Sequence, residues 1–523
     1  MTTDVKKAAD GALAPPIDVG DAEYLRLVNA AQVYDVAVET PLDYARNLSV
    51  RFENEIFLKR EDLQPVHSFK LRGAYNKIAH LSAEARERGV ICASAGNHAQ
   101  GVALSGRKLG VRAVIVMPRT TPSIKVRAVE GYGGEIVLHG DSYDEAAEHA
   151  HKLQAEQGLT YVHPYDDPEV IAGQGTVGME ILRQHPGPIH AVFCCVGGGG
   201  LVSGVAAYIK SVRPDIRVIG VEPADAASMT RSLEAGERIQ LEQVGLFADG
   251  AAVRRVGEEP FRLASKHVDA MLLVGVDEIC AAVRDIFEDT RSLAEPAGAL
   301  ALAGLKKYAA QTGVKGEHLV AIQSGANVNF DRLRYIAERA ELGEHREALL
   351  GVTIPERPGS FRQFCEIIGA RGITEFNYRY ADAQEAHIFV GVKLGAPGER
   401  AAIIESLQQA GYPVFDLSNN EMAKLHVRYM VGGRARAAEE VLFRFEFPER
   451  PGALLKFLNN VGDRWNISLF HYRNHGHAYG QVLAGMQVPE EERGHCRAAL
   501  DELGYAYEEE SGNPAYDLFL SGD

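Results

Sequence analysis

Short, continuously apolar segments alternate with amphipathic stretches from residue 56 onward, and this alternation limits the folds open to the chain. The apolar segments are residues 90–93, 113–117, 135–138, 192–196, 218–221 and 320–322. Apolar strands separated by helices are typical of parallel sheets covered on both faces, whose ligands gather at the carboxyl ends of the strands. The sequence therefore predicts an α/β domain, and the residues that directly follow these strands are its candidate site.

The pattern changes after about residue 345. Strands such as residues 443–447 alternate apolar and polar side chains, which indicates half-buried sheets. A chain of 523 residues is also too long for one core. We expect a mobile extension over 1–25, an α/β domain over 26–345 with a smaller subdomain at about 70–165, a small domain over 346–420, a linker over 421–440 and a second small domain over 441–520.

The tail contains an internal repeat. The sequence Pro-Glu-Arg-Pro-Gly occurs at 355–359 and again at 448–452, each time before an amphipathic helix. The match continues at Ile373, Phe376, Tyr378 and Arg379, which correspond to Ile467, Phe470, Tyr472 and Arg473. A Gly-Tyr pair then precedes the final strand of each copy, at 411–412 and 504–505. Two α+β units of order βαββαβ account for this period better than a solenoid, which needs more and shorter copies.

Composition excludes several classes of function. The formal net charge of −16 argues against nucleic acid or an anionic membrane as a partner. The six cysteines are scattered without a C-x-x-C pair, which favours a reducing compartment, and we expect a cytoplasmic protein. No apolar run approaches the roughly 18 residues that span a bilayer.

Four consecutive glycines, Gly197, Gly198, Gly199 and Gly200, separate the strand at 192–196 from a helix-like stretch at 201–209. Such a turn exposes backbone N–H groups with no Cβ in the way, and the helix dipole adds positive potential. The spacing matches neither a P-loop nor G-x-G-x-x-G. A flexible linker is the alternative, but the strand before and the helix after favour a phosphate site.

Lys70 lies at the start of a predicted helix that Ser68 can cap, beside an apolar stripe formed by Leu71, Ala74 and Ile78. A partly desolvated lysine loses some preference for its charged form, and a neutral amine can form a Schiff base. Most helix lysines are instead solvated surface groups.

Two further strand ends carry polar residues. Residues 94–98 form a second strand-to-helix turn, whose amides can bind a carboxylate, and Asn97 can donate to or accept from a phenolic oxygen. His98 in such a turn is more often a hydrogen-bonded supporting residue than a base, so we assign it no proton transfer. Ser324 follows the strand at 319–322, where a helix-capping role is the alternative.

Taken together and in chain order, these pieces resemble the fold-type II family of pyridoxal-phosphate enzymes, and most closely the biosynthetic threonine ammonia-lyases. The resemblance spans almost the whole chain. It includes Ser-Gly-Ala-Asn-Val-Asn-Phe at 324–330, Glu-Pro-Ala-Gly-Ala-Leu at 295–300 and the paired units of the tail. It implies a catalytic domain like the tryptophan synthase β-subunit followed by two regulatory domains of the ACT-like type.

The resemblance also implies roles for individual residues. Lys70 would hold pyridoxal 5′-phosphate and act as the base at Cα. The phosphate would lie on Gly197, Gly198, Gly199, Gly200 and Leu201. Asn97 would bond the 3′ oxygen and Ser324 would face the pyridine nitrogen. The substrate carboxylate would be surrounded by Ser94, Ala95, Gly96 and His98.

The implied reaction eliminates water from L-threonine, and hydrolysis of the resulting intermediate then gives 2-oxobutanoate and ammonia. A serine hydroxyl cannot give the ring nitrogen the countercharge that a carboxylate supplies, which favours elimination. Related serine racemases carry a divalent-metal site after the strand that ends at Glu222. Because Ser228 occupies the place of one of its carboxylates, we expect no metal.

The tail units imply regulation by isoleucine, with valine opposing it, and the family implies a homotetramer. Tyr378 and Tyr472 are candidate effector residues, since a strand of one unit could pair with the other and create a pocket between sheets. Their alternative role is core packing.

Three alternative functions remain open. A serine racemase or catabolic serine/threonine dehydratase shares the core but lacks the double tail. Threonine synthase and cysteine synthase fit the turn and serine contexts less well. An amino-acid-sensing regulatory protein on an inactive scaffold is a non-enzyme alternative, against which the intact Lys70, Asn97 and Ser324 argue.

Overall fold

The computed structural model divides into two units, one ending at Ala340 and the other starting at Glu341. It describes residues 21–523 except 345, 370, 380–383, 397, 421–422, 425–426, 430–434, 436, 449–451, 462–463, 474–478, 514–515, 517–519 and 521–523. The domain boundaries given above remain predictions. Residues 1–20 of the predicted extension lie outside the described residues, and its last part belongs to helix α1 (Asp21–Ala30).

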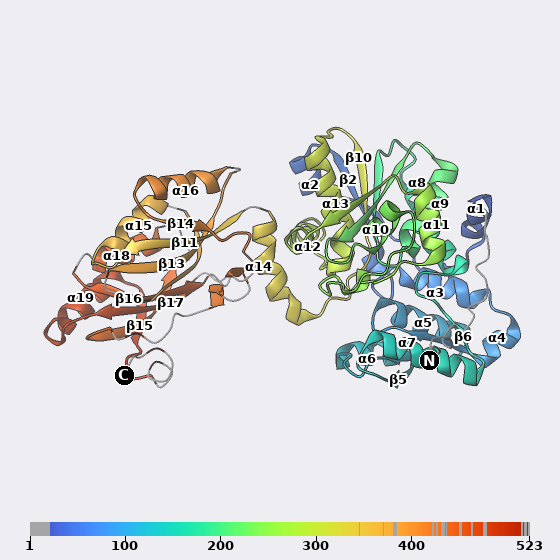
Figure 1. The fold of residues 1–523 in the computed structure, drawn as a ribbon, viewed down its shortest axis with the longest axis horizontal. Helices are drawn as coiled ribbons and strands as arrows, with labels where there is room; N and C mark the ends of the chain where they lie inside the picture. The colour runs from blue at the N-terminus through green and yellow to red at the C-terminus, as the bar shows by residue number, and fades with distance from the viewer. Residues whose placement is uncertain are drawn as a thin grey trace, which may run out of the picture. The chain divides into compact units, whose positions relative to one another are not determined.

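The first unit contains two sheets (Figure 1). The larger has the strand order β1-β2-β10-β7-β8-β9, in which only β1 is antiparallel to its neighbour. Its strands are β1 (Leu42–Tyr44), β2 (Glu55–Arg60), β7 (Ala191–Cys195), β8 (Arg217–Pro223), β9 (Ala270–Val274) and β10 (His318–Gln323). The smaller sheet is wholly parallel, with the order β5-β4-β3-β6. Its strands are β3 (Val90–Ala93), β4 (Ala113–Met117), β5 (Glu135–Leu138) and β6 (Thr160–Tyr161).

Helices separate successive strands in the first unit, and a last helix, α14, follows β10 and runs across the boundary between the units. They are α2 (Arg46–Phe52), α3 (Lys70–Ala79), α4 (Ala83–Arg88), α5 (Asn97–Leu109), α6 (Ser123–Gly131), α7 (Tyr143–Gln157), α8 (Pro168–Gln184), α9 (Gly200–Val212), α10 (Ser228–Ala235), α11 (Glu258–His267), α12 (Val276–Thr290), α13 (Pro296–Thr312) and α14 (Leu333–Gly343), with short 3₁₀ turns η1 (Glu61–Leu63), η2 (Asp249–Ala251) and η3 (Phe330–Arg332). Helices lie on both sides of the larger sheet in Figure 1. The predicted parallel α/β architecture is therefore confirmed.

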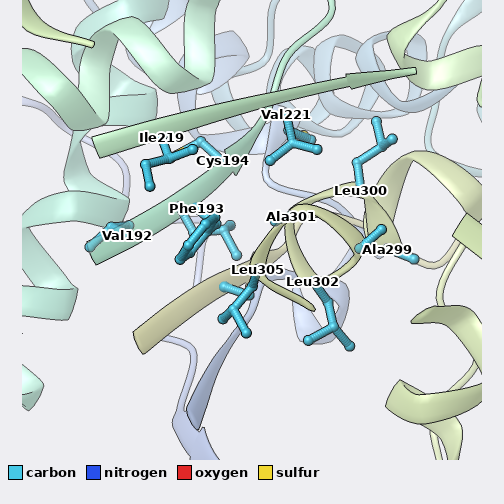
Figure 2. Packing of buried hydrophobic residues seen from close by; sticks show 14 of the residues in the cluster. Val192, Phe193, Cys194, Ile219, Val221, Ala299, Leu300, Ala301, Leu302 and Leu305 are labelled. Atoms are coloured by element: carbon cyan, nitrogen blue, oxygen red, sulfur yellow. The ribbon is translucent and has the colours of Figure 1, made fainter. Parts of the chain in front are cut away.

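The main core lies between the larger sheet and its helices. Figure 2 shows Phe193 on β7, Ile219 on β8 and Leu305 on α13 packed against one another. All three side chains are buried. Since β7 and β8 are covered on both faces, their sequences are continuously apolar, which is the signal that predicted them.

The second unit is an antiparallel sheet of eight strands with helices. Its first copy contains β11 (Glu347–Pro355), α15 (Ser360–Ile368), β12 (Ile373–Arg379), β13 (Glu385–Lys393), α16 (Glu399–Gln409) and β14 (Val414–Asp416). Its second copy contains β15 (Glu440–Pro448), α18 (Ala453–Val461), β16 (Asn466–Arg473), β17 (Tyr479–Gln487), α19 (Arg493–Leu503) and β18 (Ala506–Glu509). Short 3₁₀ turns are η4 (Val427–Tyr429) and η5 (Glu490–Glu492). The predicted βαββαβ order is confirmed in both copies.

The two copies share one sheet, of order β14-β11-β13-β12-β16-β17-β15-β18. The joint is the antiparallel pair β12–β16, in which Tyr378 lies opposite Phe470 and Phe376 lies opposite Tyr472. The predicted pairing between copies is thus confirmed. Because this pairing merges the copies into a single sheet, the predicted pocket lies between the two copies and not between two sheets.

Candidate active site

Lys70 is the first residue of α3, and it is half-buried rather than a solvated surface lysine. Its Nζ donates a hydrogen bond to the Pro164 carbonyl at 2.8 Å. Burial lowers the pKa of the amine to about 8, although the neighbouring Cys195 and Glu295 oppose that shift. The neutral, nucleophilic fraction of this amine near neutral pH is therefore far larger than that of an ordinary lysine.

Buried charges hold the helix that carries Lys70. Arg72 lies on this helix, and its guanidinium donates hydrogen bonds to Glu61 at 2.7 Å and to Glu180 at 2.6 Å. Lys59 adds a 2.6 Å contact to Glu180, and all four side chains are fully buried. Fully paired buried charges of this kind fix geometry, since breaking one pair costs about 3–5 kcal/mol.

The predicted cap at Ser68 is wrong. The residue before the helix is Phe69, which makes no side-chain cap, and the Ser68 hydroxyl is buried without a described partner. Ser68 instead forms a β-bridge with Gly325, one residue beyond Ser324. This bridge brings the chain just before Lys70 to the end of β10, where the Phe69 N–H donates to the Ser324 carbonyl at 3.2 Å.

The four glycines form a closely packed turn between β7 and α9. Gly199 precedes the helix with φ +99°, a conformation that L side chains rarely adopt. A Cβ at position 198 would lie 2.2 Å from the Tyr165 ring, so this position also accepts only glycine. The predicted strand, turn and helix are confirmed, and the close packing excludes a flexible linker. Leu201 is buried in the first turn of α9.

The second predicted turn connects β3 to α5. Gly96 precedes the helix, and its N–H meets the Ser94 hydroxyl at 3.3 Å. A Cβ on Gly96 would meet nothing within 4 Å, so the N-terminus of α5 borders open space. Ala95 is half-buried beside it. Free N–H groups at a helix N-terminus are suited to a carboxylate.

His98 is buried in the same helix, where its Nε2 donates to the Val162 carbonyl at 2.8 Å. Burial, with the nearby charge of Lys70, lowers its pKa to about 3. The imidazole is therefore neutral in the physiological range, which agrees with a supporting role and no proton transfer.

Asn97 is the centre of a chain of side-chain hydrogen bonds. Its Oδ1 accepts from Asn327 Nδ2 at 2.7 Å, and its Nδ2 donates to Glu295 Oε1 at 2.6 Å. Sequence reasoning missed these two partners: Glu295 and Asn327 lie in quoted motifs but received no role. Their polar identity was visible in the sequence, whereas their burial against Asn97 is a tertiary property.

Ser324 follows β10 and is buried, and it does not cap a described helix. Its hydroxyl accepts from the Cys195 thiol at 3.2 Å and donates to the Ala297 carbonyl at 3.3 Å. Cys195 ends β7, directly before the glycine turn region, and was another residue that sequence reasoning missed. The ends of β7 and β10 meet because they are neighbouring parallel strands of one sheet, and the hydrogen bonds of Asn97 join the turn after β3, in the other sheet, to the same place.

Comparison with known proteins identifies this arrangement. Residues 33–325 match the family model described as pyridoxal-phosphate dependent enzyme, and residues 338–427 and 431–520 each match the C-terminal regulatory domain of threonine dehydratase. The chain is 59% identical to a biosynthetic L-threonine dehydratase of Burkholderia multivorans, covering 95% of this chain and 99% of that protein. The corresponding Escherichia coli protein is 56% identical, with 96% and 98% covered. The chain belongs to the biosynthetic threonine dehydratase family.

Solved structures agree with membership of this threonine dehydratase family. The processed form of threonine deaminase isoform 2 from Solanum lycopersicum is 49% identical, with a TM-score of 0.61, covering 64% of this chain and 99% of that one. Maize serine racemase is 31% identical, with a TM-score of 0.57 over 62% of this chain and 99% of its own. The serine racemase therefore has no counterpart for the remaining 38% of this chain.

Pyridoxal 5′-phosphate, the cofactor of the family, fits the residues of this site. The glycine turn gives a phosphate the N–H groups at the start of α9, and a Cβ at Gly198 or Gly199 would fill occupied space. The partly neutral Lys70 amine suits a covalent link to the aldehyde, and the Asn97 amide and Ser324 hydroxyl suit the polar atoms of the ring.

Glu222 lies at the end of the strand after which related serine racemases carry a metal site. In this protein its carboxylate binds the start of helix α10. Its oxygens accept from the Met229 N–H at 2.7 Å and from the Thr230 N–H and hydroxyl at 2.8 and 2.6 Å. Ser228 begins that helix and is buried. Within the described residues, no group of three or more His, Cys, Asp or Glu is arranged to hold a metal ion.

The two candidate effector tyrosines lie in the second unit, at equivalent places in the β12–β16 pair. Tyr378 is buried and donates to Glu356 Oε2 at 2.6 Å, and Asn466 of the second copy donates to Glu356 Oε1 at 2.8 Å. Tyr378 and Glu356 both line a cavity that Trp465 and Asn466 close from the second copy. Tyr472 is half-buried, and part of the equivalent motif, residues 449–451, lies outside the described residues.

Proposed function

We propose that this chain converts L-threonine to 2-oxobutanoate and ammonia, with pyridoxal 5′-phosphate held at Lys70. The observation that carries the proposal is the partly neutral Lys70 amine at the point where the two glycine-containing turns and the Ser324 hydroxyl meet. The relatives that match over nearly the whole chain are named for the same reaction.

Individual residues would hold the cofactor and the substrate as follows. Backbone N–H groups of Gly197 to Leu201 would bind the phosphate, Asn97 the phenolic oxygen and Ser324 the ring nitrogen. The substrate carboxylate would bind at the start of α5, among Ser94, Ala95, Gly96 and His98, since Gly96 borders open space there. When bound, the cofactor supplies an electron sink that makes the Cα proton of an amino acid acidic.

The chain supplies the base and the surroundings for this chemistry. Lys70 would take the Cα proton once its amine is free, because burial lowers the pKa of that amine to about 8 and so raises its neutral fraction well above that of an ordinary lysine. Loss of the Cα proton together with the β-hydroxyl is loss of water, and hydrolysis then releases ammonia and the keto acid. The neutral His98 stabilises the carboxylate turn without competing for the proton.

An assay of keto-acid release tests the proposed function. Purified protein with saturating cofactor receives L-threonine or L-serine, each with and without isoleucine, and chiral analysis follows any D-serine. We expect keto acid from threonine and suppression by isoleucine. Racemised serine without keto acid would favour the racemase, and absence of both reactions would favour a regulatory protein on an inactive scaffold.

Regulation by isoleucine, opposed by valine, belongs to the same proposal. In the cavity at Tyr378, Arg357 would supply a cation to the carboxylate of an amino acid, and Phe361 and Ile467 would form apolar walls. Binding and inhibition must be reciprocal, so substrate should weaken isoleucine binding. Calorimetric titration with and without a substrate analogue tests this, and equal affinities would contradict it.

The assembly and location of the protein complete the proposal. We propose a homotetramer, on the family resemblance, which sedimentation would test. A cytoplasmic location is supported by six cysteines that are all buried and free. None of the helices in the described part of the chain is long and apolar enough to cross a bilayer.

A further inference from the structure

Glu295 is a buried carboxylate of the candidate active site to which the proposed function gives no task. It is the residue before α13 and is 5% exposed. Its Oε1 accepts a short hydrogen bond of 2.6 Å from the amide Nδ2 of Asn97. Burying a carboxylate costs free energy, so a buried carboxylate beside the amide of Asn97, which is assigned to the cofactor, indicates that Glu295 has a function there.

The hydrogen bonds around Asn97 define which way its amide points. Asn327 Nδ2 donates to the amide oxygen, and the amide nitrogen donates to Glu295. A flipped amide would set two donors against each other at Asn327 and two acceptors against each other at Glu295. The carboxylate therefore fixes the orientation, and it uses only one of the two N–H bonds of the amide nitrogen.

The backbone around Glu295 holds the carboxylate at a defined place. The Glu295 N–H donates to the Gly325 carbonyl at 3.1 Å, and a Cβ on Gly325 would lie 2.5 Å from Glu295 Oε1. A Cβ on Gly250 would lie 3.7 Å from the same oxygen. The first distance is too short for a side chain and the second is an ordinary contact, so Gly325 leaves the space that the carboxylate occupies.

We propose that Glu295 is a positioning residue, which orients the Asn97 amide so that its second N–H meets the phenolic oxygen of the cofactor and whose charge opposes negative charge on that oxygen. The inference rests on the proposed function, since it uses the cofactor contact assigned there to Asn97. Glu295 and the phenolic oxygen would then share one amide and influence each other's ionisation.

The surroundings of Glu295 support this coupling near neutral pH. Burial raises its pKa to about 7 and Asp249 on η2 adds to the rise, while the Asn97 bond, Lys125 on α6 and the Asn327 N–H oppose it. Lys70 on α3 faces the same carboxylate, and Cys195 at the end of β7 interacts with it as well. Glu295 should lose its proton as the pH rises through about 7, which places a negative charge beside Asn97 only above that pH.

Two variants separate the orientation from the charge. Glu295→Gln keeps an acceptor for Asn97 but no charge, whereas Glu295→Ala removes both. We expect Glu295→Ala to weaken cofactor binding by about 3- to 10-fold, the worth of one hydrogen bond, and Glu295→Gln to stay close to the native dissociation constant. The visible absorbance of the lysine-bound cofactor should change across pH 6–8 in the native protein and stay flat in Glu295→Gln.

Asp285→Asn provides the matched control, because Asp285 is another buried carboxylate of the same unit, paired with Arg51 and Lys306. This variant should keep the native pH response and cofactor affinity. A Glu295→Gln protein that retains the absorbance change, or a Glu295→Ala protein that binds cofactor as the native protein does, overturns the inference while the proposed function stands. A native protein that develops no visible absorbance with saturating cofactor overturns the proposed function and the inference with it.

Discussion

At the scale of single residues, burial decides the chemistry of the site. Lys70 and Glu295 are ordinary side chains whose pKa values move toward neutrality, to about 8 and about 7, chiefly because water is excluded around them. His98 is driven the other way, to about 3, and is removed from proton transfer. Burial thus makes Lys70 a better nucleophile and keeps the neighbouring His98 from taking up a proton.

The lowered pKa of Lys70 predicts how the cofactor-free protein captures pyridoxal 5′-phosphate. The amine is protonated below about pH 8 and neutral above it, so the capture rate should rise up to about pH 8 and then level off. The rise of visible absorbance after rapid mixing measures this rate. Free Nα-acetyl-lysine is the control, and its rate should keep rising toward an ordinary lysine pKa of about 10.4. A protein that follows the control would contradict the prediction.

Replacing Lys70 by alanine should abolish the visible absorbance and lower threonine turnover by at least about 10²–10⁴-fold, since the covalent link and the base are lost together. Lys77→Ala is the matched control, because Lys77 lies on the same helix and pairs with Asp167. Spectra and keto-acid release of both variants decide the matter. Normal absorbance and turnover in Lys70→Ala would refute the assignment.

At the scale of elements, the glycine turn before α9 is a rigid structure. Gly199→Ala should place a methyl group at φ +99° and 2.6 Å from the Met229 side chain. We expect about 1–2 kcal/mol of backbone strain and about 1–3 kcal/mol of overpacking, with weaker cofactor binding. Thermal unfolding and a cofactor titration measure both effects.

Gly131→Ala is the control for the glycine turn. Gly131 ends α6, and an added Cβ there meets nothing within 4 Å, so stability and cofactor affinity should remain near native values. Equal behaviour of the Gly131 and Gly199 variants would show that the turn tolerates side chains, contrary to the structure.

The elements also show which features a sequence can predict. Apolar runs such as residues 113–117 became strands with those bounds, because a strand covered on both faces needs no polar positions. The prediction that Ser68 caps the helix was wrong, because Ser68 pairs with Gly325, and local capping preferences cannot predict such a long-range contact. Glu295 was present in a quoted motif, but only the fold brings it within 2.6 Å of a residue nearly two hundred positions away.

At the scale of the whole molecule, the two units have separate cores. One cluster of buried side chains lies between the α/β sheet and its helices, and another fills the eight-stranded sheet. Sequence periodicity predicted both architectures and the repeat. The two copies form one sheet because the backbones of β12 and β16 pair. The only sign of this pairing in the sequence was the pair of matching tyrosines.

Separate cores predict separate responses to ligands. Calorimetry of the full chain should show two unfolding transitions, and cofactor at about 100 times its dissociation constant should stabilise one of them by about 2.7 kcal/mol. Isoleucine should raise the other transition. The experiment without either ligand is the reference, and a single transition shifted by both ligands would contradict this expectation.

The pairing of β12 with β16 has a consequence for any shortened form of this protein. A chain ending before residue 440 would leave β12 with a row of unsatisfied amides and carbonyls, which is a template for aggregation. Each copy of the repeat covers the strand edge of the other, so deletion of one copy should first cause self-association of the shortened protein, and loss of the response to isoleucine should be the lesser effect.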